Sequence, residues 1–373
     1  MNKELHIITL DVPCPPDYGG MIDTFYRIKT LHHIGIQIHL HCFEYGRPHA
    51  SELDSLCKTV NYYTRKPGLL PHLTLLPFTV KSRSSKTLLK NLLRYNFPIL
   101  FDGLHTTFYL GHPSLSDRKM FVRTHNIEHR YFTSLSAFER DPLRKLYFKI
   151  ESLRLKLYEK ILKKAERLFT ISPGDFEYFE NRYHNAELIL PFHPSGIIDS
   201  QKGIGEYCLY HSNLSVSENI AVAEFLISKV FSKVSHTCII AGKNPPKRLL
   251  DKSSPFRNIR IISDPDNETM VNLISNAQIN ILPVYAINGL KLKLLIALCS
   301  GRHCIVNEKM IRGTWLEALC HIADSAESMT ERINSLMQQP FTEEMISARE
   351  RIITKYYNNF STGKKLASLI FAD

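Results

Sequence analysis

The sequence predicts an α/β protein with two facing, Rossmann-like domains, each built on a doubly wound parallel sheet, with a cleft between them. Three observations predict this fold class. Short apolar runs with strand character alternate with helical patterns, which is the repeat of a parallel α/β sheet. A proline-bearing linker at 191–196, extended by polar residues to Gly205, divides that alternation near its middle. At 373 residues the chain is long enough for two substantial cores.

The first domain is expected to span residues 1–190, with a helix at about 355–373 completing it. A first strand is followed by a proline-rich loop that ends in Gly19 and Gly20, and by a helix that begins near Met21. The strands are expected at 5–10, 36–43, 98–101, 119–124 and 167–171. The loop lacks Gly-x-Gly-x-x-Gly and is too long for a tight pyrophosphate turn. These features argue against a nicotinamide or flavin dehydrogenase.

The second domain is expected at about 200–350, and its strands at 207–211, 236–241, 259–262, 279–283 and 303–306. Ser215 and Glu218 have the spacing of a capping box at the start of its first helix. Asp264-Pro265-Asp266 resembles a metal-binding Asp-x-Asp pair, but a turn followed by a helix N-cap is the favoured interpretation.

The stretch 288–307 has the pattern of a loop, a helix and a strand, and an apolar strand precedes it. Gly289 and Leu290 lie where this helix begins, and Lys291 and Lys293 fall in its first turn. A helix N-terminus favours anions through its unpaired N–H groups and its dipole, and lysines there suit a phosphate. The alternative is that both lysines simply lie on a solvated face.

Positive charge is concentrated in the first half of the chain. The net charge is +11, and residues 1–190 contribute +8 of it, from 27 basic and 19 acidic side chains. Such a field fits a phosphorylated substrate, nucleic acid or an anionic membrane. Nucleic acid is the least favoured partner, because the sequence contains no nucleic-acid recognition motif.

Two basic segments lie between the strands of the first domain. Segment 81–94 has five basic residues, no acid, and leucines at helical spacing. It fits a helix on an anionic membrane or beside an acidic acceptor, and equally an ordinary helix that packs its leucines on the sheet. Segment 140–167 is a long basic helical stretch, interpreted as mostly a solvated face.

The sequence favours a cytoplasmic location. No apolar run reaches the length of a membrane span, and the N-terminus lacks the plan of a signal peptide. The eight cysteines show no Cys-x-x-Cys spacing, which is typical of reduced thiols rather than of disulfides or a zinc site. Peripheral contact with the inner membrane face is compatible with the basic first half.

The order of motifs resembles glycosyltransferase family 4, the retaining sugar-nucleotide transferases of GT-B fold. The resemblance extends over most of the chain. The matching elements are the glycine-bearing loop 13–20 followed by Arg27, Thr124-His125-Asn126-Ile127-Glu128, Ser172-x-x-Asp175, Asn213-Leu214-Ser215, Ala241-Gly242-Lys243-Asn244-Pro245-Pro246, and Gly289 to Gly301 with Arg312-Gly313 downstream. Ile296 departs from the family, which often has a glutamate there that resembles a holder of the donor ribose. The Arg…Lys pair that many members use on the donor diphosphate is also absent.

The resemblance implies a retaining glycosyltransferase that moves a sugar from a nucleotide-sugar donor to a lipid-linked or glycan acceptor in polysaccharide or glycoconjugate synthesis. The first domain would bind the acceptor and the second the donor, with no metal and no other cofactor. The resemblance makes His125 and Glu128 the candidate catalytic residues. The candidate donor-binding residues are Gly19, Gly20, Asn213, Lys243, Gly289, Leu290, Lys291 and Lys293.

Position in the chain gives independent grounds for some of these residues. His125 directly follows a predicted strand, where a cleft-facing side chain belongs. It would bond the transferred sugar or the acceptor, or else only a nearby loop carbonyl. Glu128 would be a base or a loop cap. Gly19 and Gly20 would let backbone N–H groups approach the donor, or form an ordinary turn.

Two rival functions stay open. Ile296 motivates a catalytically inert GT-B-like partner subunit. A nucleotide-sugar epimerase has a related fold, but it would need paired acids in the first domain.

Overall fold

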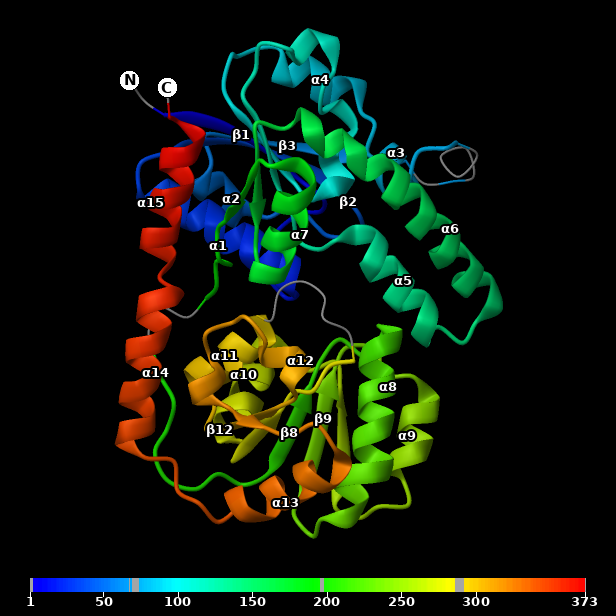
Figure 1. Cartoon of the computed structure of the whole chain (residues 1–373), viewed down its shortest axis with the longest axis vertical. Helices are drawn as coiled ribbons and strands as arrows, with labels where there is room; N and C mark the ends of the chain where they lie inside the picture. Colours follow the sequence, from blue (N-terminus) through cyan, green and yellow to red (C-terminus); the bar gives the residue numbers. More distant parts are fainter. Residues whose placement is uncertain (1–2, 67, 69–73, 195–197, 286–291, 373) are drawn as a thin grey trace.

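The computed structural model describes residues 3–66, 68, 74–194, 198–285 and 292–372. They form two Rossmann-like domains, one above the other in Figure 1, and each has a parallel sheet between layers of helices. The expected fold class is confirmed. Among the described residues, none of the helices has the length and apolar character needed to cross a bilayer.

The first sheet has seven parallel strands in the order β3-β2-β1-β4-β5-β6-β7. The strands are β1 Glu4–Thr9, β2 Gln37–Glu44, β3 Thr59–Thr64, β4 Ile99–Asp102, β5 Met120–Arg123, β6 Arg167–Thr170 and β7 Ala186–Leu188. The order reverses between β1 and β4, so the ends of these two strands border a crevice.

Seven α-helices belong to this part of the described chain: α1 Gly19–His33, α2 Ser51–Leu56, α3 Phe78–Lys81, α4 Lys86–Leu92, α5 Glu128–Phe138, α6 Pro142–Tyr158 and α7 Pro173–Tyr183. Apolar side chains cover both faces of the sheet, in one cluster around Phe25 and Leu100 and another around Phe101 and Leu155. Helices α5 and α6 form a hairpin that projects at the right of Figure 1.

The second sheet has six parallel strands in the order β10-β9-β8-β11-β12-β13. The strands are β8 Cys208–His211, β9 Cys238–Gly242, β10 Ile259–Ser263, β11 Ile279–Ile281, β12 His303–Val306 and β13 His321–Ile322. The helices are α8 Ser217–Phe225, α9 Lys247–Ser253, α10 Asn267–Asn276, α11 Leu292–Ser300, α12 Glu308–Ile311 and α13 Ala326–Leu336. Helix α11 ends at Ser300, and a Cβ on the following Gly301 would collide with Asn280 and with the carbonyl of Ala297.

The last two helices run along one side of the molecule from the second domain to the first (Figure 1). Helix α14 (Glu343–Tyr356) contacts the second domain, where buried Arg349 donates to the carbonyl of Gly301. Helix α15 (Asn359–Ile370) packs on α1, and Leu366 and Ile370 are buried in the core of the first domain. The C-terminal segment is therefore shared between the two domains.

Four local expectations are wrong. Strands β3, β7 and β13 were not expected, because each is an edge strand with a weak apolar pattern. The capping box at Ser215 is absent: Val216 is the N-cap of α8, and the Ser215 hydroxyl donates to Asn213 Oδ1 at 2.7 Å.

Segment 81–94 is not one helix but the end of α3, a turn, and α4. Leu88 and Leu92 of α4 are fully buried in the core, as the packing alternative predicts, so they are unavailable to a membrane. The N-cap expected after Asp264 is confirmed, since Asp266 Oδ1 accepts from the N–H of Thr269 at 2.7 Å.

Candidate active site at the domain interface

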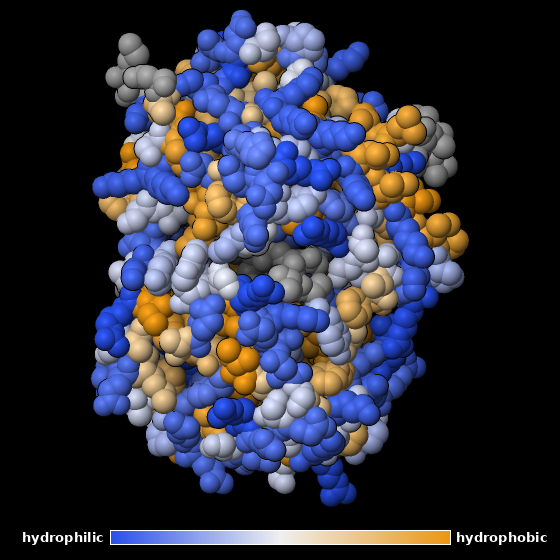
Figure 2. Space-filling view, viewed as in Figure 1, coloured by the Kyte–Doolittle hydropathy of each residue, from blue (hydrophilic) through white to orange (hydrophobic). Residues whose placement is uncertain are grey.

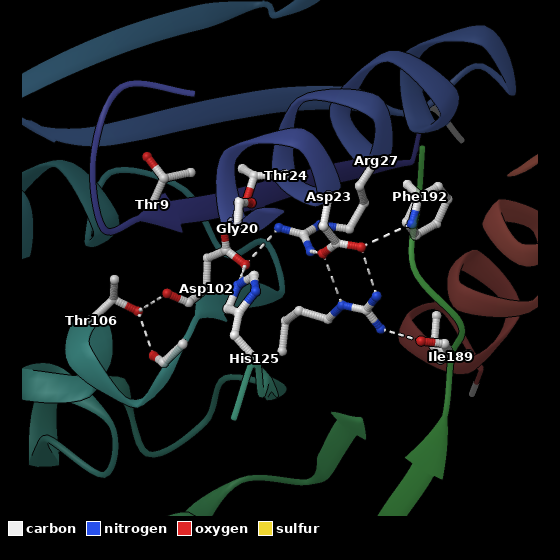
Figure 3. Close-up of polar contacts among 12 residues, drawn as sticks. Thr9, Gly20, Asp23, Thr24, Arg27, Asp102, Thr106, His125, Ile189 and Phe192 are labelled. Atoms are coloured by element: carbon white, nitrogen blue, oxygen red, sulfur yellow. Dashed lines mark hydrogen bonds and ion pairs between the residues drawn. The ribbon is translucent and has the colours of Figure 1, made fainter. Parts of the chain in front are cut away.

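The ends of two neighbouring strands bring Asp102 and His125 together. Asp102 is the last residue of β4, and His125 follows β5 by two residues. Nε2 of His125 lies 2.8 Å from Asp102 Oδ1, and both side chains are buried (Figure 3). In sheets of this kind, ligands bind outside the carboxyl ends of the strands. The pair lies at that edge of the first sheet.

Two arginines and a second aspartate balance the charge of Asp102 in a buried cluster. Arg27 of α1 donates to Asp102 Oδ1 at 2.7 Å and to Asp23 Oδ2 at 2.7 Å. Arg123 of β5 donates to Asp23 Oδ1 at 2.8 Å. All four side chains are fully buried, so two positive and two negative charges offset one another away from water.

The ionised Asp102 determines which nitrogen of His125 carries a proton. Burial raises the pKa of Asp102, but the charges of Arg27 and His125 outweigh burial and hold this pKa well below its usual range. The hydroxyl of Thr24 also donates to Asp102. A carboxylate only accepts hydrogen bonds, so Nε2 of His125 is the donor. In the neutral ring, Nδ1 is then the acceptor.

Gly19 and Gly20 form the start of α1, next to His125. A Cβ on Gly20 would stand 4.0 Å from Nδ1 of His125 and 3.6 Å from the ring of Tyr18, whereas a Cβ on Gly19 would meet nothing within 4 Å. The N–H groups of a first helical turn lack partners within the helix. Gly20 therefore keeps Nδ1 of His125 and the start of α1 unobstructed by a side chain.

Glu128 is the first residue of α5 and is also buried. Its Oε2 lies 3.3 Å from Nε2 of His105, in the 3-10 helix Leu104–Tyr109. Burial raises the pKa of Glu128, but the neighbouring His105 and His125 outweigh burial and lower it. Glu128 is thus ionised and paired with His105. Its catalytic role stays a prediction. Ile127, and not Glu128, occupies the N-cap position of α5, and it makes no side-chain cap hydrogen bond.

Asp23, Asp102 and His125 also lie close enough together to hold a metal ion. Their oxygens, however, already accept hydrogen bonds from Arg27 and Arg123. A cation at this point would have to displace or repel two buried guanidinium groups. The donor set therefore fits an ion-pair cluster better than a metal site.

On the facing domain, Asn213 and Lys243 follow β8 and β9. Asn213 is exposed and shapes its turn by accepting from the N–H of Ser215 at 3.0 Å. Lys243 Nζ lies 2.5 Å from Asp17 Oδ2, in the loop that leads to Gly19. Lys243 therefore bridges the two domains beside the start of α1, where its charge is neutralised by Asp17.

Helix α11 presents Lys293 to the end of β8. Nζ of Lys293 lies 5.5 Å from the centroid of the Tyr210 ring. Burial and the charge of Lys293 lower the pKa of the adjacent His211 to about 3, so His211 is neutral. The other residues expected at this helix start, Gly289, Leu290 and Lys291, lie outside the described residues.

A cavity of about 410 Å³ lies between the domains. Its walls come from both: the start of α5 and the turn before α7 on one side, and α11 with residues 312–316 on the other. Arg130, Lys309 and Arg312 line it, together with Asp175 and Glu177. The cavity has room for a small organic ligand, and its charges are mixed.

Sequence reasoning missed three members of the buried cluster: Asp23, Asp102 and Arg123. One signal was available, because Asp102 directly follows the strand expected at 98–101, just as His125 follows the next strand. Asp23 and Arg123 lie within a helix and a strand, so only the fold reveals that they meet.

No protein-family model matches the chain. An uncharacterized 44.6 kDa protein of the cps region of Klebsiella pneumoniae is 25% identical over 313 residues, which cover 78% of this chain and 79% of that protein.

Several solved structures share the fold over nearly the whole chain. Sucrose-phosphate synthase from Thermosynechococcus elongatus superimposes with a TM-score of 0.68, 13% identity and 98% coverage of both chains. HepE from Anabaena, solved with UDP and glucose, superimposes with a TM-score of 0.68, 11% identity and 99% coverage of both chains. TarM superimposes with a TM-score of 0.66 and 12% identity, and the match covers 100% of this chain and 99% of TarM. These neighbours are glycosyltransferases with two facing Rossmann-like domains, and this chain has their GT-B fold.

Proposed function

We propose that the protein is a retaining glycosyltransferase, which moves a sugar from a nucleotide-sugar donor to a glycan or lipid-linked acceptor. The observation that carries this proposal is His125, which ionised Asp102 holds at the carboxyl edge of the first sheet beside the start of α1. The structural neighbour HepE was solved with UDP and glucose, and TarM of S. aureus with UDP and α-GlcNAc-glycerol. The relative from a cps region supports a role in polysaccharide synthesis.

The reaction exchanges one bond of the anomeric carbon for another. The bond from that carbon to the β-phosphate oxygen breaks, and a bond to the acceptor hydroxyl oxygen forms on the same face. The acceptor proton leaves with the nucleoside diphosphate. Negative charge therefore grows on the diphosphate in the transition state, and positive charge grows on the anomeric carbon.

In this proposal, His125 positions the sugar. Its Nε2–H is committed to Asp102, so Nδ1 is the atom available to accept a hydrogen bond from a sugar hydroxyl. The start of α1, with Gly19 and Gly20, offers N–H groups beside it. Glu128, two residues from the cavity wall at Arg130, is the candidate base.

The second domain binds the diphosphate in this proposal. Lys293 on α11 and Lys243 after β9 supply the positive charge, and Lys243 would exchange Asp17 for the phosphates. Arg312 and Lys309 add cations on the cavity wall. The same side chains take the place of a divalent metal, so chelators are expected to leave turnover unchanged.

The test uses the purified full chain with a panel of nucleotide sugars, and release of nucleoside diphosphate as the readout. We expect one donor to raise the melting temperature, because a bound ligand stabilises the folded state. That donor should also be consumed when a glycan or lipid-linked acceptor is present, with or without EDTA. Consumption that stops in EDTA would contradict metal independence.

The inert-partner alternative predicts a different outcome, namely nucleotide binding with no turnover of any donor. The side chain of Ile296, which motivates that alternative, packs against the core of the second domain. Lys243, Lys293, Lys309 and Arg312, which this proposal assigns to the diphosphate, are separate side chains. Donor hydrolysis or transfer by the wild-type chain therefore excludes the inert partner.

A further inference from the structure

Helix α6 exposes a continuous row of aliphatic side chains. Residues three or four apart share one face of a helix, and five aliphatic residues follow this spacing. They are Leu143, Leu146, Ile150, Leu153 and Leu157, with exposed fractions from 43% to 78%. We call these five residues the α6 stripe. Figure 2 shows hydrophobic residues gathered at the right of the upper half, over the α5–α6 hairpin.

The α6 stripe is not the packing face of its helix. That face carries Glu151, Ser152 and Leu155, which are buried against the rest of the domain. A soluble protein seldom exposes so many large aliphatic side chains together, and such patches mark interaction surfaces. The side chains on this side of α6 are exposed, as the solvated-face interpretation of 140–167 predicts, but most of them are leucines rather than charged residues.

Positive charge borders the stripe. Segment 142–164 contains eight basic residues and two acidic ones. Both acids face inward: Glu151 accepts from the N–H groups of Phe78 and Thr79, and Glu159 accepts from Tyr178 and Tyr183. Lys149, Lys156 and Lys160 are exposed and fall along one edge of the stripe. The outward face thus combines aliphatic and cationic side chains without an acid.

We propose that the α6 stripe and its lysines dock the protein on an anionic lipid surface. Aliphatic side chains would enter the region of the lipid headgroups, while lysines at the edge would meet the negative headgroups. A second copy of the chain is the less suitable occupant, because neither acid of segment 142–164 faces outward to pair with the lysines of another copy. The proposal does not depend on sugar transfer.

The first test measures flotation of the full chain with vesicles made of equal parts phosphatidylglycerol and phosphatidylcholine, and with phosphatidylcholine vesicles. The wild type should float with the anionic vesicles only. Replacing Leu146, Leu153 and Leu157 together by Gln should lower the bound fraction about tenfold, because the apolar contribution is lost. Replacing Lys149, Lys156 and Lys160 by Gln should have a similar effect at low salt.

The matched control lies on α4 and removes the same charge. Lys86, Lys90 and Arg94 are also exposed, but the apolar surface beside them is smaller, because Leu88 and Leu92 are buried and Leu93 is 45% exposed. Their triple change to Gln should leave vesicle binding within about twofold of wild type. Equal losses in the α4 and α6 variants, or an α6 leucine variant that floats like wild type, would overturn the proposal.

A fluorescence measurement locates the contact. The single tryptophan, Trp315, is replaced by Phe, and a new tryptophan is placed at Leu153 or, as a control, at Leu250, an exposed residue of α9. The emission of Leu153→Trp should shift to the blue on anionic vesicles, and that of Leu250→Trp should not. A blue shift without vesicles, together with a dimer mass in light scattering, would identify a second copy as the occupant and overturn the lipid proposal.

A measurement of sugar transfer shows whether the lipid-docking proposal and the glycosyltransferase proposal stand or fail independently. The α6 leucine variant should consume the donor at the wild-type rate with a water-soluble acceptor, because the stripe lies outside the interdomain cavity. A variant that loses vesicle binding and keeps this turnover supports docking. A parallel loss of donor turnover with a soluble acceptor would show that α6 serves the active site instead.

Discussion

At the scale of single residues, the charge balance around Asp102 is central to both stability and the candidate site. Asp102 and Asp23 offset Arg27 and Arg123 in a fully buried cluster. Removing one member of such a cluster leaves an uncompensated charge away from water, which costs about 3–5 kcal/mol. The cluster joins α1 to β4 and β5, so it also determines where His125 lies.

The first prediction follows from that balance. Asp102→Asn should lower the free energy of unfolding by about 3–5 kcal/mol, because a net positive charge remains buried. Chemical denaturation measures the loss. Asp251→Asn, at an exposed position on α9, is the control and should change stability by less than about 0.5 kcal/mol. Similar stability of both variants would show that the cluster contributes little.

A second prediction concerns the stability of the folded protein at acidic pH. Burial, and then the charge of His39, lowers the pKa of His6 to about 3, and burial, and then the charge of Lys293, lowers that of His211 to about 3. The unfolded chain takes up these protons below about pH 6.5, whereas the folded chain does not until about pH 3. Unfolding free energy should therefore fall as the pH drops through this window.

Each such histidine contributes a slope of about 1.4 kcal/mol per pH unit. The carboxylates with lowered pKa take up protons in the unfolded chain only below about pH 5. From about pH 6.5 to 5 the slope therefore comes mainly from histidines: these two, and His41, His193, His303 and His321, whose pKa values burial also lowers. Denaturant midpoints measured at several pH values report the slope. A flat profile over this interval would mean that these histidines are protonated in the folded protein.

Sequence reasoning identified His125 and Arg27 but not Asp23, Asp102 or Arg123. The first two lie in motifs whose order is informative in the sequence. Asp23, Asp102 and Arg123 can be recognised as a cluster only when α1, β4 and β5 are brought together, because their partners lie 75 to 100 residues away along the sequence.

At the scale of elements, strong apolar periodicity allowed most central strands and long helices to be predicted. The missed strands lie at sheet edges, β3 and β7 in the first sheet and β13 in the second, where lower burial weakens the pattern. The basic segment 81–94 shows the limit of charge patterns, since leucines that pack in a core and leucines that face lipid have the same spacing.

Contact between α15 and α1 gives a third prediction. A Cβ on Gly363 would stand 2.6 Å from Cγ2 of Thr30. Gly363→Ala should therefore destabilise the protein by about 1–3 kcal/mol through overpacking, although alanine favours helices. Adding Thr30→Ser removes that methyl group, keeps the hydroxyl bond to the Tyr26 carbonyl, and should restore stability.

The control for this pair is Gly174→Ala in α7, where a Cβ would meet nothing within 4 Å. It should be neutral or stabilising in the same denaturation assay. If Gly363→Ala behaves like Gly174→Ala, then the two helices do not pack as closely as the structure has them.

Helix α11 gives a fourth prediction. Lys293→Ala should weaken nucleoside diphosphate binding by about tenfold or more, because a charge-assisted bond to phosphate contributes about 1.5–3 kcal/mol. Calorimetry measures the affinity, and Lys252→Ala, an exposed residue of α9, serves as the control. Unchanged affinity in Lys293→Ala would mean that this lysine simply lies on a solvated face of the helix and does not bind phosphate.

At the scale of the whole molecule, the two domains meet through polar and aromatic contacts. Asp17–Lys243 bridges them on one side of α1, and Arg140 at the α5–α6 turn pairs with Glu224 of α8 at 2.7 Å. Phe138 stacks on Tyr285 with ring centroids 5.3 Å apart. These contacts align the start of α1 and His125 with the domain that carries α11.

The two-domain plan was predictable because both halves repeat the strand–helix alternation and a proline-bearing segment separates them. The contacts between the domains were not predictable, because side chains such as Asp17, Lys243 and Arg140 cannot be told from ordinary surface charges in the sequence. Their pairing depends on how the two domains face each other, which a local pattern does not encode.

The central claim is that His125 acts on the donor sugar through Nδ1 while Asp102 holds Nε2. Two substitutions of His125 distinguish the role of Nδ1 from the role of Nε2. Glutamine places an amide near Nε2 and preserves the contact with Asp102, whereas asparagine places one near Nδ1 and loses that contact. The direct test is donor turnover of His125→Gln and His125→Asn, with nucleotide affinity measured in parallel.

We expect His125→Gln to stay as stable as wild type and to bind nucleotide normally, yet to lose about 100-fold in turnover, since a hydrogen bond to developing charge is lost. His125→Asn should be less stable and keep more turnover than the glutamine variant. Wild-type turnover in His125→Gln would contradict the claim and leave His125 with a purely structural role beside Asp102.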